Sequence, residues 1–384
     1  MMDFTFSSEQ QMLRETTRRF VDRELRPIAQ QIDKTQEVPR WLIHKAGEIG
    51  LLGVPFPDTY GGSGLGETGY CLVLEEVGRV CASTGVTIGA HVGLAGFAIL
   101  LGGTEEQKRR HLPKLISGEW LGAYALTEPG AGSDAANIQM EATRDGNDFV
   151  LNGTKLWISN GDIADLLIVF AVTDPARRAR GGITAFLVER TSPGFSANRI
   201  HDKMGLRGSS TAELVLDHVR VPAEQVLGPV GSGFALAMKT LDESRLSLAA
   251  ACIGAGKELI RLSTDFAKKR HAFGHPIAQF QAIQWMLADM VTDVFLMESA
   301  VYRTAWMYDK GQRITRESAI CKLYASEALC RIADKAVQIH GGMGYMGEHS
   351  VERYYRDARI NRIFEGTDEI QRLVIAEDLL KQTG

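Results

Sequence analysis

The sequence is poor in cysteine, and neither sign of charge predominates in it. Its 384 residues include five cysteines, at positions 71, 81, 252, 321 and 330, without a CxxC pair or a regular spacing. A scattered, odd set of this kind is typical of free thiols in a reducing compartment and argues against a disulfide scaffold. The 43 basic and 47 acidic residues give a net charge of −4, which lacks the basic surplus of a nucleic-acid-binding protein. We expect no nucleic-acid partner, and no group of Cys, His and Asp has the spacing of metal ligands.

An apolar leader is also lacking, because Met1-Met2-Asp3 runs directly into polar sequence. We therefore expect a cytoplasmic bacterial protein, although a mature mitochondrial-matrix form would begin in the same way. One uncharged stretch, 82–104, resembles a membrane span and repeats Gly85, Gly89 and Gly93 at four-residue spacing. It also contains His91, so we expect a buried core helix and no integral membrane segment.

Hydrophobic periodicity divides the chain into three domains, at 1–120, 121–230 and 231–384. The first is predicted to be helical, with a helix capped by Ser7 or Ser8 whose apolar side chains recur at helical spacing. Two further helical stretches are expected over about 68–101 and 105–116.

The middle domain has short β-branched runs over 166–172, 183–188 and 213–221. Asn152-Gly153 lies between two apolar runs, which is a strong signal for a β-hairpin turn. Strands at this spacing predict a small β-barrel or sandwich.

The third domain returns to helical periodicity. Stretches of about 234–270, 277–310, 315–340 and 367–380 with short connections predict an antiparallel four-helix bundle. The whole chain is therefore expected to be an α+β multidomain protein. Gly342 to Gly347 matches GxGxxG, but it follows a helical run, whereas a dinucleotide fingerprint must follow a strand.

Four segments, in this order, carry a resemblance to a known family: Tyr124 to Asp134 (YALTEPGAGSD), Trp157 to Gly161 (WISNG), Gln338 to Gly342 (QIHGG), and Tyr355 to Arg359 (YRDAR) continuing to Glu365-Gly366-Thr367. Together, on a helix–β–helix outline, they resemble the acyl-CoA dehydrogenases. The resemblance implies a homotetramer with one FAD per subunit between the β-domain and the bundle. It further implies an acyl-CoA substrate and electron transfer to electron-transfer flavoprotein.

Glu365 is the expected catalytic base. The α-proton of a thioester is weakly acidic, so its removal needs a carboxylate in a dry pocket that raises its pKa. From its position alone, Glu365 could instead be a first-turn glutamate that favours the helix dipole. Some family members place the base just before an arginine, here at Ser244 before Arg245, but serine cannot act as this base. Glu243 would point about 100° away on the helix.

The resemblance also assigns the cofactor and substrate contacts. The turn from Thr127 to Ser133 would supply donors to the flavin, Trp157 would pack on its ring and the Ser159 hydroxyl would reach its N5. Arg270 and Phe273 would reach the FAD of a neighbouring subunit. The expected FAD-binding residues are Tyr124, Leu126, Thr127, Gly132, Ser133, Trp157, Ile158, Ser159, Arg270, Phe273, Gln281, Gln338, Ile339, Gly341, Gly342, Thr367 and Glu369; the expected substrate-binding residues are Ser133, Asp242, Arg245 and Gly366.

The substrate is expected to be a short- to medium-chain or branched-chain acyl-CoA. Relatives that hold a dicarboxylate have an arginine near the position of Gly85, and this chain has none there. Oxidases of the same fold are usually much longer, and nitroalkane-oxidising relatives have Asp in place of Glu365. A non-catalytic, DNA-binding flavoprotein is the alternative of another class, and it would need a basic face or extension.

Overall fold

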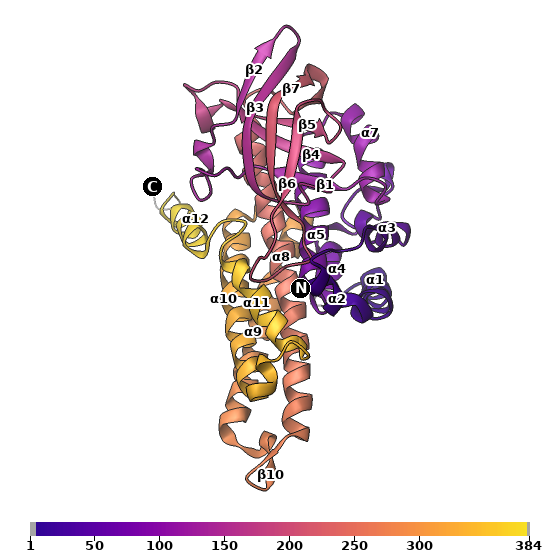
Figure 1. Cartoon of the computed structure of the whole chain (residues 1–384), viewed down its shortest axis with the longest axis vertical. Helices are drawn as coiled ribbons and strands as arrows, with labels where there is room; N and C mark the ends of the chain where they lie inside the picture. The colour runs from indigo at the N-terminus through magenta and orange to yellow at the C-terminus, as the bar shows by residue number, and fades with distance from the viewer. Residues whose placement is uncertain (1–4, 382–384) are drawn as a thin grey trace.

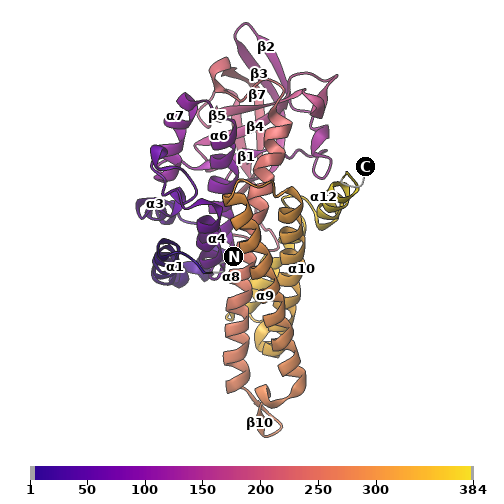
Figure 2. The ribbon, with the colours of Figure 1, turned by 180° about the vertical axis from the view of Figure 1, so that it is seen from behind.

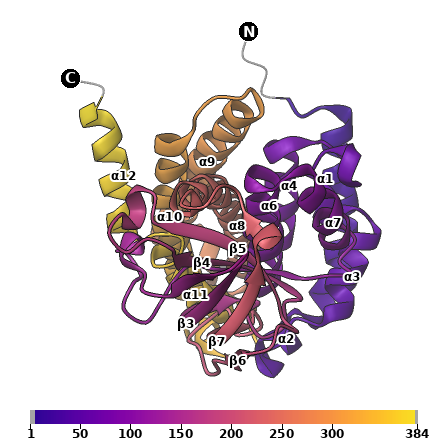
Figure 3. The ribbon, with the colours of Figure 1, turned by 90° about the horizontal axis from the view of Figure 1, so that it is seen from above.

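Helices, then a sheet, then long helices follow one another along the chain in the computed structural model, which describes residues 5–381 (Figure 1). The predicted Met1-Met2-Asp3 start lies outside the described residues. The sheet occupies one end of an elongated molecule, and the long helices run down its long axis. Seen from above, the N-terminal helices and the last helix lie on opposite sides of these long helices (Figure 3).

The N-terminal part is helical, as predicted. The first helix begins after Ser7, whose hydroxyl accepts from the backbone N–H of Gln10 while the Gln10 side chain accepts from the N–H of Ser7. This reciprocal pair satisfies two donors that the first turn would leave free. The helices are α1 (Ser8–Phe20), α2 (Ala29–Thr35), α3 (Arg40–Glu48), α4 (Gly66–Gly78), α5 (Ala82–Ile88), α6 (Phe97–Gly102) and α7 (Glu105–Ile116), with π-helical turns η1 (Val21–Leu25) and η5 (Gly89–Gly96).

The prediction of one helical stretch over 68–101 was wrong. Helix α4 ends at Gly78, and Cys81 has an extended backbone, with φ −150° and ψ 104°, before α5 begins. The segment Ala82–Gly102 is long and apolar enough to cross a membrane, yet 67% of its most apolar window is buried inside the molecule. It packs on β1 and α8, which is the arrangement of the expected core helix.

The middle part is an eight-stranded sheet in the order β6-β7-β3-β2-β4-β5-β8, with β1 parallel to β4. Strand β4 is buried along its whole length because its two faces meet different cores. Ile168 and Phe170 face the helices, whereas Leu167 and Val169 face a core built from the sheet itself. The strands are β1 (Gly122–Ala125), β2 (Glu141–Asp145), β3 (Asp148–Ser159), β4 (Leu166–Val172), β5 (Ile183–Glu189), β6 (Phe195–Arg199), β7 (Thr211–Pro222) and β8 (Val226–Leu227).

The predicted hairpin turn at Asn152-Gly153 was also wrong. Strand β3 runs through both residues, and its register against β7 shifts there by a β-bulge. The Oδ1 atom of Asn152 accepts from the backbone N–H of His218, so the asparagine stabilises the bulge. The hairpin between β2 and β3 turns instead at Gly146, which has φ +64°.

The C-terminal part contains three long helices, α8 (Gly233–Lys269), α9 (Gln281–Asp309) and α10 (Thr315–His340). A two-stranded hairpin of β9 (His271–Ala272) and β10 (His275–Pro276) joins α8 to α9 at the end away from the sheet (Figure 2). Helix α12 (Asp368–Lys381) packs on α10, and the short α11 (Ser350–Ala358) was not predicted. Because α10 ends at His340, GxGxxG does follow a helix, as expected.

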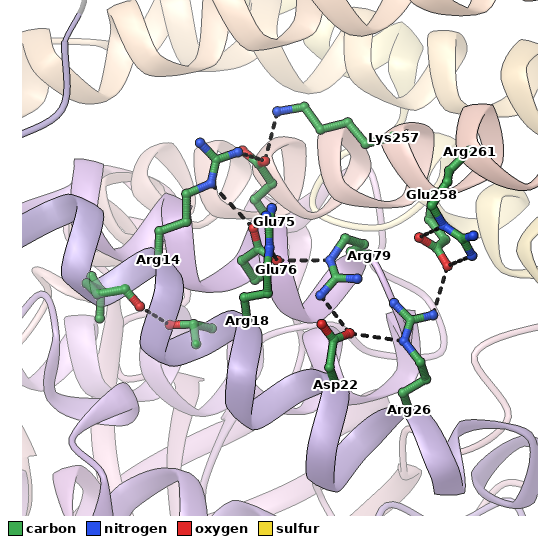
Figure 4. A network of polar contacts seen from close by, with 12 residues as sticks. Arg14, Arg18, Asp22, Arg26, Glu75, Glu76, Arg79, Lys257, Glu258 and Arg261 are labelled. Atoms are coloured by element: carbon green, nitrogen blue, oxygen red, sulfur yellow. Dashed lines mark hydrogen bonds and ion pairs between the residues drawn. The ribbon is translucent and has the colours of Figure 1, made fainter.

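Buried ion pairs join the N-terminal helices to α8 (Figure 4). Glu76 on α4 is 1% exposed and forms ion pairs with Arg14, Arg18 and Arg79. The neighbouring Glu75 forms ion pairs with Arg14 and with Lys257 of α8. Burial raises the pKa of Glu76, but its hydrogen bonds and charge pairs with these arginines outweigh burial and hold the pKa below its usual value. The helices that form one wall of the interior are thereby fixed to the bundle.

Helices α4 and α8 touch at glycines. A β-carbon at Gly254 would lie 1.8 Å from the carbonyl oxygen of Glu75, whereas one at Gly89 would meet nothing within 4 Å. We expect Gly254→Ala to lower the free energy of unfolding by about 2 kcal/mol through overpacking. Gly89→Ala makes the same change in open space and is expected to leave stability unchanged or raise it by up to about 1 kcal/mol. Denaturant unfolding of both variants checks this, and equal stabilities would contradict it.

Candidate active site

A cavity of about 370 Å³ lies where the sheet, α8 and the N-terminal helices meet the loop before α12. Small and apolar residues of α5 and η5, including Gly85 and Ala90, line one side. Leu241 and Leu248 of α8 line another, and Trp157 and Ser159 of β3 line the sheet side. An apolar cavity with a few convergent polar groups is the usual form of a small-molecule site.

Two carboxyl residues of the described chain line this cavity, Glu365 and the exposed Asp134. The Oε1 atom of Glu365 accepts from the Ser244 hydroxyl at 2.9 Å, and among the described residues its Oε2 has no hydrogen-bond partner. Burial raises the pKa of Glu365, and the Ser244 hydrogen bond and the charges of Arg245 and Lys322 only partly oppose that effect. A carboxylate with one unoccupied oxygen and a raised pKa is suited to accept a proton.

The backbone at Glu365 is strained and firmly held. Its φ is +56°, a left-handed conformation that costs a non-glycine residue about 1–2 kcal/mol. Gln371 donates to the carbonyl oxygens of Glu365 at 3.1 Å and of Gly366 at 3.0 Å. Arg245 donates to the Glu365 carbonyl at 3.1 Å and pairs with Asp242. Strain that neighbours enforce in this way is typical of functional positions.

The sheet side of the cavity is an aromatic and hydroxyl-bearing surface. Strand β3 shifts register between Lys155 and Ile158, so Trp157, with φ +62°, stands outside the ladder and is 59% exposed. Ser159, Thr127 and Ser133 bring hydroxyl groups to the same cavity. An exposed indole beside hydroxyl donors fits a flat ring with polar edges.

Three family models match the chain: acyl-CoA dehydrogenase N-terminal domain over 7–119, middle domain over 123–219 and C-terminal domain over 231–380. The chain belongs to the acyl-CoA dehydrogenase family. It is 46% identical to the probable acyl-CoA dehydrogenase YngJ of Bacillus subtilis, covering 99% of this chain and 100% of that protein. It is 44% identical to the mitochondrial short-chain specific acyl-CoA dehydrogenase of Rattus norvegicus, covering 97% and 90%. The solved butyryl-CoA dehydrogenase of Megasphaera elsdenii is 39% identical, with a TM-score of 0.96 and 99% and 100% coverage.

Acyl-CoA dehydrogenases are FAD enzymes that act on acyl-CoA substrates. The residues of this dehydrogenase fit the cofactor, because the exposed Trp157 and its hydroxyl neighbours offer the surface that a flavin ring needs. The predicted site residues that line the cavity are Tyr124, Leu126, Thr127, Gly132, Ser133, Trp157, Ile158, Ser159, Arg245, Glu365 and Gly366. Asp242 joins them through Arg245, and Thr367 and Glu369 lie at the start of α12.

A second group of predicted residues lies far from this cavity, at the opposite end of the bundle. Arg270 borders the β9–β10 hairpin, and Phe273 at its tip is 93% exposed. Arg270 lines a separate hollow with His340. One chain therefore does not bring this group to Glu365: Arg270, Phe273, Gln281, Gln338, Ile339, Gly341 and Gly342.

One glutamate and one histidine that were not predicted as site residues have hydrogen-bond partners elsewhere in the structure. Glu243 does not line the cavity; it accepts from the Tyr308 hydroxyl on α9, and burial raises its pKa to about 8. His91 lies between the carbonyl oxygen of Leu115 and the backbone N–H of Gly122, at 2.9 Å each. It is a satisfied core histidine.

Sequence reasoning missed the groups that support the site. Lys155 is fully buried and donates to Glu128 at 2.7 Å, and Glu128 accepts from the backbone of Met140. This pair fixes the turn from Thr127 to Ser133 against β3. Lys322 and Asp368 form a second buried pair beneath the Glu365 loop. The sequence offered one indication, a lysine within the apolar run of β3. It suggests a buried charge but does not show which residue pairs with it.

We expect Ser244→Ala to raise the pKa of Glu365 further, because it removes a hydrogen bond that stabilises the carboxylate. The expected shift is roughly one unit, from about 1.5 kcal/mol for such a bond. If Glu365 acts as a base, it works only when ionised, so the rate would fall as pH falls through this pKa. The acid limb of the pH profile, in which the rate of FAD reduction by an acyl-CoA is plotted against pH, should therefore move to higher pH. Ser247→Ala, which removes a bond to the Ser244 carbonyl instead, should not move it.

Proposed function

We propose that this enzyme dehydrogenates a short- to medium-chain or branched-chain acyl-CoA to the trans-2-enoyl-CoA, in fatty-acid β-oxidation or branched-chain amino-acid breakdown. The observation that supports this most strongly is the carboxylate of Glu365, one oxygen of which has no hydrogen-bond partner among the described residues, in an apolar cavity that Trp157 also lines. Bound FAD would supply the acceptor for the hydrogen and electron pair that leave the β-carbon. The FAD and substrate contacts assigned to the cavity residues are part of this proposal.

Glu365 is the proposed base. The bond between the α-carbon and its proton breaks, and the proton passes to Oε2, which has no competing donor among the described residues. Ser244 holds the other oxygen, so the carboxylate cannot rotate freely. Arg245, Gln371 and the left-handed backbone hold the loop, so that the base meets the substrate in a fixed orientation.

The cavity walls support an uncharged acyl chain. Arg245 is the one cation among the described residues that line it, and Asp242 and the Glu365 carbonyl already engage its guanidinium. A second carboxylate on the substrate would be buried without a partner, at a cost of several kcal/mol. The similarity to a short-chain specific enzyme and a butyryl-CoA dehydrogenase also supports a short chain.

We further propose a homotetramer in which Arg270 and Phe273 reach the FAD of a neighbouring subunit. The bundle carries exposed aromatic and aliphatic side chains that favour such an assembly. These include Phe273, Trp285, Val291, Phe295, Leu296 and Trp306. Electron-transfer flavoprotein is the proposed acceptor from the reduced enzyme, and a cytoplasmic location stays a prediction.

The proposed reaction is tested by the visible spectrum of the purified enzyme without oxygen. Butyryl-, octanoyl- and isovaleryl-CoA are added in turn, and we expect one of them to bleach the flavin. Glu365→Gln should slow bleaching at least about 100-fold, because it removes the base. Glu243→Gln is the matched control, since it changes a buried carboxyl outside the cavity and should bleach normally. A colourless protein that cannot be reconstituted with FAD would sink the proposal.

The proposed subunit arrangement is tested at Arg270. Arg270→Gln should weaken FAD retention roughly 10-fold, which corresponds to one charge-assisted hydrogen bond. Lys268→Gln removes an exposed cation two residues away and should retain FAD. FAD content after gel filtration and subunit mass by light scattering measure both effects. A monomer that binds FAD fully would contradict the arrangement.

A further inference from the structure

A buried ion pair lies directly beneath the loop that carries Glu365. Lys322 of α10 is 0% exposed and Asp368, the first residue of α12, is 1% exposed; their charged atoms are 3.1 Å apart. Ser326 donates to the same carboxylate at 2.7 Å, and Arg362 donates to its other oxygen at 2.8 Å. Two charges placed this deep need good geometry to be tolerated, and here every carboxylate oxygen has a partner.

This pair holds the segment after Glu365 through contacts other than those of Arg245. Asp368 follows Glu365 by three residues, and Gln371 lies one turn further along α12. The Gln371 side chain donates hydrogen bonds to the carbonyl oxygens of Glu365 and Gly366. Asp368 therefore ties the first turn of α12 to α10, and α12 in turn holds the strained backbone of Glu365. Without this attachment, the left-handed residue could relax and withdraw its carboxylate from the cavity.

The pair also sets the charge around the base. Lys322 lowers the pKa of Glu365, against the larger effect of burial. The other groups that act on the Glu365 carboxylate or feel its charge are Ser244, Arg245 and Cys252 of α8, Tyr124 of β1 and Tyr70 of α4. Of these, Arg245 is the one cation, and it is paired with Asp242.

We propose that the Lys322–Asp368 pair is a positioning element for the base, which fixes the loop of Glu365 and places a buried positive charge within electrostatic reach of its carboxylate. The proposal rests on the proposed role of Glu365. It goes beyond that role, because neither residue lines the cavity or contacts the substrate site.

Opposite charge changes in the pair provide the test. Lys322→Met removes the positive charge and leaves Asp368 with Arg362 and Ser326, so the acid limb of flavin bleaching should move to higher pH. Asp368→Asn leaves the Lys322 charge unpaired, so the limb should move to lower pH. Each shift is expected to be roughly one unit. The double variant should return the limb towards its wild-type position.

A purely structural role would not give this pattern. It would lower the rate without shifting the acid limb, or would shift the limb in the same direction in both variants, and either result would overturn the proposal. Glu327→Gln is the matched control, because it removes a carboxylate that joins α10 to α12 through Arg372 at the more exposed edge. It should leave the limb in place. If one variant fails to fold, the other still predicts a definite direction of shift.

The same experiment separates this inference from the proposed function. If Glu365→Gln bleaches like wild type, Glu365 is not the base and both fail. If Glu365→Gln is inert, Glu365→Asp moves the limb, and the Lys322 and Asp368 variants do not, then the base stands and only the positioning proposal fails. The bleaching rate at saturating thioester is expected to fall in both pair variants, with little change in the half-saturating concentration.

Discussion

The site depends on one constraint, which is that a buried carboxylate must be held with one oxygen to which no described residue donates a hydrogen bond. Removal from water disfavours the charged form of Glu365, and its backbone is held in a conformation that glutamate rarely adopts. Neither condition would persist on a free loop. Ser244, Arg245 and Gln371 hold the residue directly, and Lys322 and Asp368 hold the helix that follows it.

The three parts of the chain are arranged around this constraint. Helix α8 contributes the hydroxyl and the guanidinium, α10 contributes the buried lysine, and the sheet contributes the opposing aromatic surface. The N-terminal helices close the cavity from the remaining side. The glycine contact between α4 and α8 and the ion pairs of Glu75 and Glu76 keep that wall in place. No single part of the described chain forms the cavity.

The second group of predicted residues lies apart from the cavity and fits a site shared between subunits. Arg270, Phe273, Gly341 and Gly342 gather at the end of the bundle away from Glu365, where all four residues are exposed. Their exposure and the apolar face of α9 fit a site completed by a second copy, as proposed above. In that arrangement, assembly and cofactor binding would be linked, because binding to the assembled form stabilises it.

The sequence by itself determined the element types, the helix–sheet–helix order and the family. Periodicity predicted α7, α10 and β4 with their observed bounds, because long or continuous apolar patterns depend on local geometry. Motifs predicted site roles for Glu365, Trp157 and the turn from Thr127 to Ser133, and residues of all three line the cavity. Local pattern failed where a tertiary contact overrode it. Asn152-Gly153 became a bulge because β7 pairs across it, and the helical stretch after Thr68 broke where α4 meets α8. Only the tertiary structure decided the partners of Ser244, Lys155 and Lys322, since a buried polar group is satisfied by residues distant in sequence that no spacing reveals.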